Sequence, residues 1–325
     1  MTDPQPSSSG VISLGDLLRI NHKPPDCLVE PGLLPQQGIL FCGGEPKVGK
    51  SLLVANLALA LAAGSHRAGF SVPAARRVLM CQFELPTEQF ASRLWHMRQA
   101  LGSLADDNLF VDTRSTGHLL SSAGGLNHFI AAARAAAADV IVLDPLYSAH
   151  DQDENDTRAM ASLCQTLLRL RDASHAALIV VHHIRKSVGR HEIGTAFRGS
   201  SALHAVGDSY MLLTRPSPLI NTVELRFQFR YAAPNPPMLL RLDTSTLWFA
   251  SSDQPAPACE PKRKVEMSDV QKALGAIGSA AGYNALRYQI MTLTTCSKRT
   301  AQLAISHACD ENIIVKDNGH YRLPS

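Results

Sequence analysis

The sequence predicts an α/β protein with a mostly parallel central sheet, followed by a small C-terminal unit of three helices and a hairpin. Up to about residue 250, short apolar runs that suit strands alternate with helical patterns, which is typical of parallel strands joined by crossover helices. Several runs are apolar at every position, as strands covered on both faces require. After residue 264 the apolar residues recur at helical spacing, and an Asn-Gly turn signal follows.

The alternation defines each expected element of the larger unit. The expected strands are 38–43, 77–84, 139–144, 177–184, 208–215 and 222–230. The expected helices between them are 51–63, 88–101, 125–137 and 156–173. The acidic segment before the last of these helices is expected to cap it through Asn155 or Asp156, because such side chains accept hydrogen bonds from the first free backbone N–H groups.

Composition divides the chain into a Ser/Pro/Gly-rich disordered tail (1–12), an α/β domain (13–250), a linker (251–264) and a compact C-terminal domain (265–325). Three helices followed by a hairpin describe a winged helix-turn-helix. The net charge is +3, and nine Lys/Arg against five Asp/Glu after residue 260 place +4 in the last fifth of the chain. A basic appendage on a neutral body indicates a nucleic-acid partner.

Two features of the composition exclude whole classes of protein. The seven cysteines are scattered and form no C-x-x-C pair, which is typical of reduced thiols in a cytoplasmic protein and not of a disulfide framework or zinc site. No run of eighteen uncharged apolar residues occurs, and the first residues lack a signal-peptide pattern. We therefore expect a cytoplasmic protein without a membrane partner.

The segment between the first strand and the first helix of the α/β domain fits G-x-x-x-x-G-K-[ST], the phosphate loop. Glycines let backbone N–H groups surround phosphate oxygens, and the helix N-terminus adds free donors. The alternative is a glycine turn that matches by chance, but the flanking strand and helix favour nucleotide binding. The expected nucleotide-binding residues are Gly44, Glu45, Pro46, Lys47, Val48, Gly49, Lys50, Ser51 and Leu52.

Two strand-end carboxylates supply the remaining chemistry of ATP hydrolysis. Asp144 ends the run DVIVLD, where it is expected to hold Mg²⁺ directly or through water, together with the Ser51 hydroxyl. Glu84 ends the run RVLMCQFE, on the strand expected to neighbour the phosphate-loop strand, and is a candidate general base for the attacking water. The alternative for Glu84 is a solvated residue before Pro86.

With the segments IVVHHIRK and TAFRGSSAL, these motifs resemble the RecA-type core ATPases, specifically the RepA-like hexameric replicative helicases of mobilisable plasmids, over about Gly38 to Leu242. The resemblance implies a RecA-like domain that assembles into a ring, with ATP between adjacent subunits and single-stranded DNA in the channel. It implies that Lys50 acts in phosphate binding and catalysis, and that Glu84 is the base. It also implies that His183, with His182 beside it, senses the γ-phosphate; the alternative is one packed and one solvated histidine.

A basic segment (185–203) follows these histidines and is rich in Gly, Arg and Lys. It is either an ordinary mobile loop or a pore loop that follows a phosphate backbone. Because it lies at the carboxyl edge of a parallel sheet, where ligands bind, we favour the pore loop. Its candidate DNA-binding residues are Arg185, Lys186, Arg190 and Arg198.

The chain departs from the family in two places. Where a trans-acting arginine is expected, the sequence has Asp208, and the nearest substitute is the late strand that carries Arg226, Gln228 and Arg230. Related ring helicases place a Lys-x-Arg pair there, so Arg230 is the candidate arginine finger. The second departure is the C-terminal domain, whose presumed recognition helix begins with Lys298, Arg299 and Gln302. These residues suit double-stranded DNA, although many winged helices bind protein.

Three functions remain open from the residues alone. The first is an ATP-driven motor on single-stranded DNA, a replicative or mobile-element helicase, and it is the one we expect. The second is a regulatory or recombination ATPase that assembles on DNA without unwinding it. The third, a module in which nucleotide only switches assembly, is disfavoured by the complete catalytic set. ATP and Mg²⁺ are the expected cofactors, and a homo-oligomeric, hexameric ring is the expected assembly.

Overall fold

The structure is a computed structural model that describes residues 11–20, 26–102, 104–184, 193, 200–216, 219–252, 265–278, 280–294, 296, 298–317 and 319–324. The chain divides into two compact units, Met1–Ala256 and Pro257–Ser325. Most of the expected tail (1–12) and of the expected linker (251–264) lies outside the described residues. Within the described ranges, no helix has the length and apolar character needed to cross a membrane.

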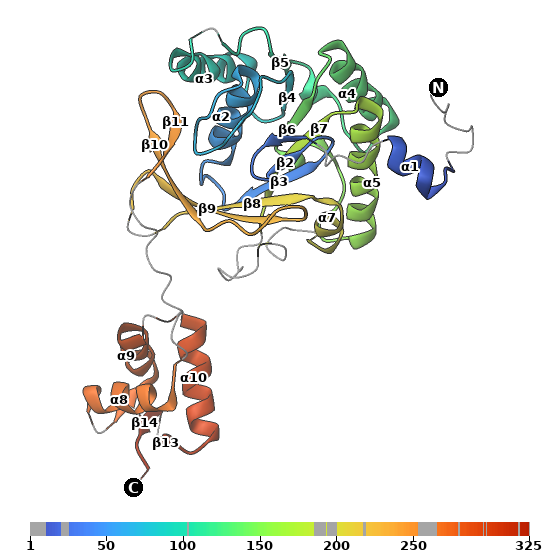
Figure 1. The fold of residues 1–325 in the computed structure, drawn as a ribbon. Coiled ribbons are helices and arrows are strands. Elements are labelled where there is room, and N and C mark those ends of the chain that lie inside the picture. Colours follow the sequence, from blue (N-terminus) through green and yellow to red (C-terminus); the bar gives the residue numbers. More distant parts are fainter. Residues whose placement is uncertain are drawn as a thin grey trace. The chain divides into compact units, whose positions relative to one another are not determined.

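A nine-stranded sheet with the order β11-β10-β9-β8-β3-β7-β6-β4-β5 forms the centre of the first unit (Figure 1). The six strands from β8 to β5 in this order run parallel, and β9, β10 and β11 extend one edge as antiparallel strands. Their bounds are β3 Ile39–Gly44, β4 Val78–Gln82, β5 Leu109–Asp112, β6 Val140–Asp144, β7 Ala177–His183, β8 Ser209–Thr214, β9 Thr222–Phe229, β10 Met238–Asp243 and β11 Trp248–Ser251.

Helices cover both faces of this sheet, which explains why its central strands are apolar throughout. Successive side chains of a strand point to opposite faces. Leu40 and Cys42 of β3 therefore join the core under helix α2, whereas Ile39 and Phe41 join a separate core under α4 and α5. The helix bounds are α2 Lys50–Ala63, α3 Thr87–Gln99, α4 Ala123–Ala135, α5 Thr157–Ser174 and α7 Ser200–Val206.

The expected strands and helices of the α/β domain all occur, with ends shifted by one or a few residues. Asp156 caps α5, accepting a hydrogen bond from the Arg158 N–H. The short elements were missed because they carry too few residues to show a period: α1 Leu14–Ile20, β1 Cys27–Val29, β2 Leu34–Pro35, β5, α7, β10, β11 and the 3-10 turns η1 Ser115–Gly117 and η2 Leu146–Ala149.

One prediction about the topology is wrong. β4, the strand before Glu84, does not neighbour the phosphate-loop strand β3, because β7 and β6 lie between them. The strand also ends at Gln82, two residues before Glu84. Crossover connections can skip positions in a sheet, so the order of strands along the chain does not determine which of them become neighbours.

The C-terminal unit contains three helices and a three-stranded antiparallel sheet with the order β12-β14-β13. Its core includes Val270 and Leu274 from the first helix, Leu286 from the second, Ile305 from the third and Tyr321 from the sheet. The element order agrees with three helices followed by a hairpin, and the winged helix-turn-helix stays a prediction. The bounds are α8 Met267–Ile277, β12 Ala281–Gly282, α9 Tyr283–Thr294, α10 Lys298–Asp310, β13 Val315–Asp317 and β14 His320–Arg322.

Candidate nucleotide-binding site

The phosphate loop connects the end of β3 to the first residue of α2, so its backbone curls directly over a helix N-terminus. Two glycines are required for this course. Gly49 adopts φ 109°, a left-handed conformation that side chains rarely tolerate. A Cβ atom at Gly44 would lie 2.8 Å from the Leu213 carbonyl oxygen and 2.9 Å from Val48 Cγ1. The glycines of the motif are therefore explained by local geometry.

Lys50 directs its ammonium group into the loop. Its Nζ donates hydrogen bonds of 2.9 Å to the carbonyl oxygens of Gly44 and Glu45. Burial lowers the pKa of Lys50, and the nearby carboxylates of Asp144 and Glu84 oppose this effect. The lysine is thus held inside the loop at the position where it can contact the phosphates of a nucleotide.

Ser51 and Asp144 come together from different elements. The Ser51 hydroxyl, at the start of α2, donates a 2.9 Å hydrogen bond to Asp144 Oδ1 at the end of β6. Asp144 is only 2% exposed. Burial raises its pKa to about 6, and the hydrogen bond from Ser51 acts in the opposite direction. A hydroxyl beside a carboxylate is a donor set that suits Mg²⁺.

This donor set is incomplete without a nucleotide. Among the residues that the structure describes, no group of three or more His, Cys, Asp and Glu could hold a metal ion. Mg²⁺ typically takes one or two protein ligands and completes its octahedron with phosphate oxygens and water. Ser51 and Asp144 therefore fit a metal that arrives with the nucleotide.

A cavity of about 300 Å³ lies beside the loop and brings the separate motifs together. Lys50, Ser51, Glu84 and His183 all line it, although they come from distant segments of the chain. Glu84 reaches it from the bend after β4, where Gln82 Oε1 accepts a 3.0 Å hydrogen bond from the Glu84 N–H. The carboxyl ends of parallel strands thus converge on one cavity, as the ligand side of an open α/β sheet requires.

The two histidines at the end of β7 separate. His183 lines the cavity, and His182 is completely buried. The β7 register places His182 beside Gly43 and His183 beside Gly44, next to the start of the phosphate loop. This arrangement agrees with a sensor role for His183, which stays a prediction.

Sequence analysis missed two sets of cavity residues. Arg93 of α3 lines the same cavity as Lys50 and Glu84, and its charge acts on Asp144. A second cavity, of about 360 Å³, adjoins the loop, and Arg215 at its wall donates a hydrogen bond to the Lys47 carbonyl. Its apolar wall is formed by Leu52, Leu219, Ile220, Val223, Leu242 and Phe249. No motif marks these residues, because only folding brings them to the loop.

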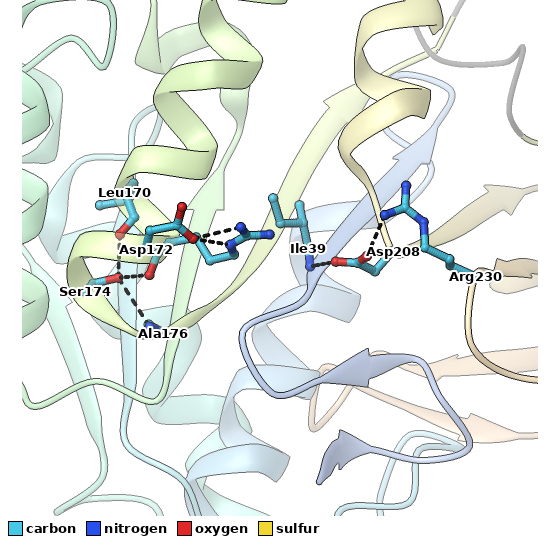
Figure 2. Close-up of polar contacts among 8 residues, drawn as sticks. Ile39, Leu170, Asp172, Ser174, Ala176, Asp208 and Arg230 are labelled. Carbon is cyan, nitrogen blue, oxygen red and sulfur yellow. Dashed lines mark hydrogen bonds and ion pairs between the residues drawn. The ribbon is translucent and has the colours of Figure 1, made fainter. Parts of the chain in front are cut away.

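The candidate arginine finger lies at the opposite edge of the sheet from the phosphate loop of its own chain, where β3 begins. Arg230 Nη1 forms a 3.1 Å ion pair with Asp208 Oδ1, and Nη2 donates a 2.9 Å hydrogen bond to the Ala205 carbonyl (Figure 2). Asp208 Oδ2 accepts a 2.9 Å hydrogen bond from the Ile39 N–H. Arg226 pairs at 2.6 Å with Glu224. The residue that replaces the expected cation, Asp208, is therefore the partner of the candidate finger.

The candidate DNA-binding residues fall into two groups. Arg185, Lys186, Arg190 and Arg198 lie outside the described residues. Lys298, Arg299 and Gln302 lie in the first turns of α10 and are exposed. The C-terminal unit therefore presents two cations and an amide on its third helix.

The fold and the loop define a P-loop ATPase domain of the RecA-like type. The sequence matches the model of the AAA domain family AAA_25 over residues 12–189, more than half of the chain, and the chain belongs to this family. No curated protein matches the sequence.

Two solved structures share the fold at low sequence identity. One is an isolated ATPase domain, with a TM-score of 0.52 and 13% identity, and the match covers 67% of this chain and 86% of that domain. The other is a DnaB-like replicative helicase, solved with a view to its interactions with primase, with a TM-score of 0.54 and 13% identity. That match covers 66% of this chain and 57% of the helicase, so the chain spans little more than half of its length.

Proposed function

We propose that the chain is an ATP-hydrolysing, oligomeric motor on single-stranded DNA, of the RepA-like type of replicative or mobile-element helicase. The observation that carries the proposal is the cavity shared by Lys50, Ser51, Glu84 and His183, with Asp144 bonded to Ser51. A domain that only bound nucleotide would not need a carboxylate at the base position. The DnaB-like helicase shares the fold and supports the same class.

In the proposed reaction, the loop amides and Lys50 hold the β- and γ-phosphates. Glu84 accepts a proton from a water molecule that attacks the γ-phosphorus, while the bond to the β–γ bridging oxygen breaks. Ser51 and Asp144 would hold Mg²⁺, which neutralises charge on the phosphate oxygens when it is bound. His183 would contact the γ-phosphate, and the apolar wall that includes Leu52 and Phe249 would receive the base.

The proposed assembly is a hexameric ring in which Arg230 of one subunit completes the site of the next. Arg230 lies away from the phosphate loop of its own chain, and its side chain is 44% exposed despite the pair with Asp208. An exposed guanidinium at the far edge of the sheet can contact a second copy, but it cannot contact its own nucleotide. The single-stranded DNA would be held by the basic segment 185–203, and cytoplasmic location follows the same proposal.

The alternative is a DNA-dependent regulatory or recombination ATPase that assembles on DNA without unwinding it. The C-terminal unit favours it, because α10 presents exposed Lys298, Arg299 and Gln302. A separate unit that bound double-stranded DNA through this helix could recruit the ATPase to a particular site.

The test compares wild type with Glu84→Gln and Lys50→Ala in assays of nucleotide binding, ATP turnover and strand separation. Glu84→Gln should bind ATP normally and lose turnover by a factor of about 100 or more, because removing a general base typically costs that much. Lys50→Ala should lose binding as well. Normal turnover in Glu84→Gln would refute the base, and DNA-stimulated turnover without separation of a forked substrate would favour the regulatory alternative.

A further inference from the structure

The strand β7 presents its two final histidines to different surroundings. His183 lines the nucleotide cavity, whereas His182 is 0% exposed and lies beside Gly43 of β3. Because adjacent side chains of a strand point to opposite faces, a shift at one histidine is passed to the other through the same backbone. Whatever His182 contacts inside the protein therefore influences how His183 faces the nucleotide.

The buried contact of His182 comes from the acidic segment 150–156, between η2 and α5. Three acids of this segment are exposed and occupied locally: Asp151 accepts a hydrogen bond from Ser121, Asp153 binds the Asn155 N–H, and Asp156 caps α5. Glu154 differs from them, since it is 8% exposed. Its Oε1 lies 3.7 Å from His182 Nδ1.

Burying a carboxylate costs several kcal/mol, about as much as a whole domain can lose without unfolding, unless the charge is compensated. The distance of 3.7 Å is within ion-pair range but beyond that of a hydrogen bond. His150 is also buried and senses the same group: burial lowers the pKa of His150, and the carboxylates of Glu154 and Asp151 oppose this effect. An interior acid beside two histidines is thus built into the connection that follows Asp144.

We propose that Glu154 is a positioning residue, which acts through His182 to hold His183 against the nucleotide. This inference rests on the proposed ATPase function and adds a residue to it. The segment that carries Glu154 begins at the metal-side carboxylate, Asp144, and the strand that carries His182 ends at the nucleotide cavity. The Glu154–His182 contact therefore fastens the two sides of the site to each other.

The test uses the full chain and compares Glu154→Gln with the matched control Asp153→Asn, which removes a neighbouring exposed carboxylate. Glu154→Gln should lower kcat for ATP about tenfold, since small displacements of a positioned group cost one to two orders of magnitude. The KM for ATP and the Kd of a fluorescent ATP analogue should stay within about twofold, because Lys50 and the loop are untouched. Asp153→Asn should retain the wild-type kcat.

A double mutant separates positioning from general damage. In the His183→Ala background, Glu154→Gln should cause no further loss of kcat, because the residue through which it acts is gone. Unchanged kcat in the single mutant, an additive loss in the double mutant, or a parallel loss of nucleotide affinity would each overturn the inference. If Glu154→Gln does not fold, Glu154→Asp, which withdraws the carboxylate by one methylene, is judged by the same measurements. Absence of turnover in wild type would instead overturn the ATPase function itself, and this inference with it.

Discussion

Two buried aspartates lie at opposite edges of the same sheet and have different partners. Asp144, 2% exposed, accepts a hydrogen bond from the Ser51 hydroxyl, and burial raises its pKa to about 6. Asp208, 7% exposed, accepts hydrogen bonds from the Ile39 N–H and from the Arg230 guanidinium. Among the described residues, only the second of these two carboxylates forms an ion pair.

The difference shows how one fold separates binding chemistry from structural chemistry. A buried carboxylate that is paired with a cation inside the protein has its charge compensated, and removing its partner is costly. A buried carboxylate that has a hydroxyl partner and a cavity beside it is available to a cation from outside. The edge that holds the phosphate loop is therefore the reactive one, and the edge with Asp208 is the fastened one.

Arg230 is the residue that most directly challenges this division, because it is proposed to serve a neighbouring site. Arg230→Ala should leave nucleotide affinity intact and lower turnover by a factor of about 1000, as loss of an arginine finger typically does. The turnover of wild type should rise with protein concentration as the oligomer forms, and that of the variant should not.

Adding inactive subunits supplies the control for Arg230. Lys50→Ala chains retain Arg230, so mixing them with Arg230→Ala chains should restore part of the turnover. If the mixture stays inactive, or if Arg230→Ala turns over ATP like wild type, Arg230 is only the partner of Asp208.

Asp144→Asn tests the reactive side of the comparison. The amide keeps a hydrogen-bond acceptor for Ser51 but loses the charge that would hold Mg²⁺. We expect turnover to fall about 100-fold at a fixed Mg²⁺ concentration, with a smaller loss of ATP binding. The melting temperature should stay the same or rise, because the buried charge is unfavourable in the absence of a cation. A large fall in melting temperature would mean that Asp144 is structural in the same sense as Asp208.

The sequence sufficed for the parts of the fold and site that depend on local pattern. The strand that leads to Gly44, the helix that begins at Lys50 and the strand that ends at Asp144 all occur where the apolar periods place them. The phosphate loop could be predicted because its glycines answer a purely local need for backbone geometry. Those elements set the plane and one edge of the site.

The remaining features depend on contacts between distant segments, which no local pattern records. The separation of β3 from β4 by two strands is one example, and the placement of Arg93 in the cavity is another. The pair formed by Asp208 and Arg230 is a third, since the sequence shows only an acid where a cation is expected. The buried state of Glu154, within a run of exposed acids, likewise follows from tertiary packing alone.

Asp208→Asn provides the smallest and most specific test of the fastened edge. The amide still accepts from Ile39, so the variant loses mainly the charge-assisted bond to Arg230, which is worth about 2 kcal/mol of unfolding free energy. In a unit of this size that corresponds to a fall in melting temperature of about 5 °C. The matched control is Asp172→Asn, which breaks the 2.7 Å pair with Arg171 (Figure 2), whose carboxylate is 62% exposed. An exposed pair contributes about 0.5 kcal/mol or less, so the control should melt like wild type. Equal shifts in the two variants would show that Asp208 and Arg230 are no more fastened than a surface pair, which would leave the guanidinium free to move toward a neighbouring subunit.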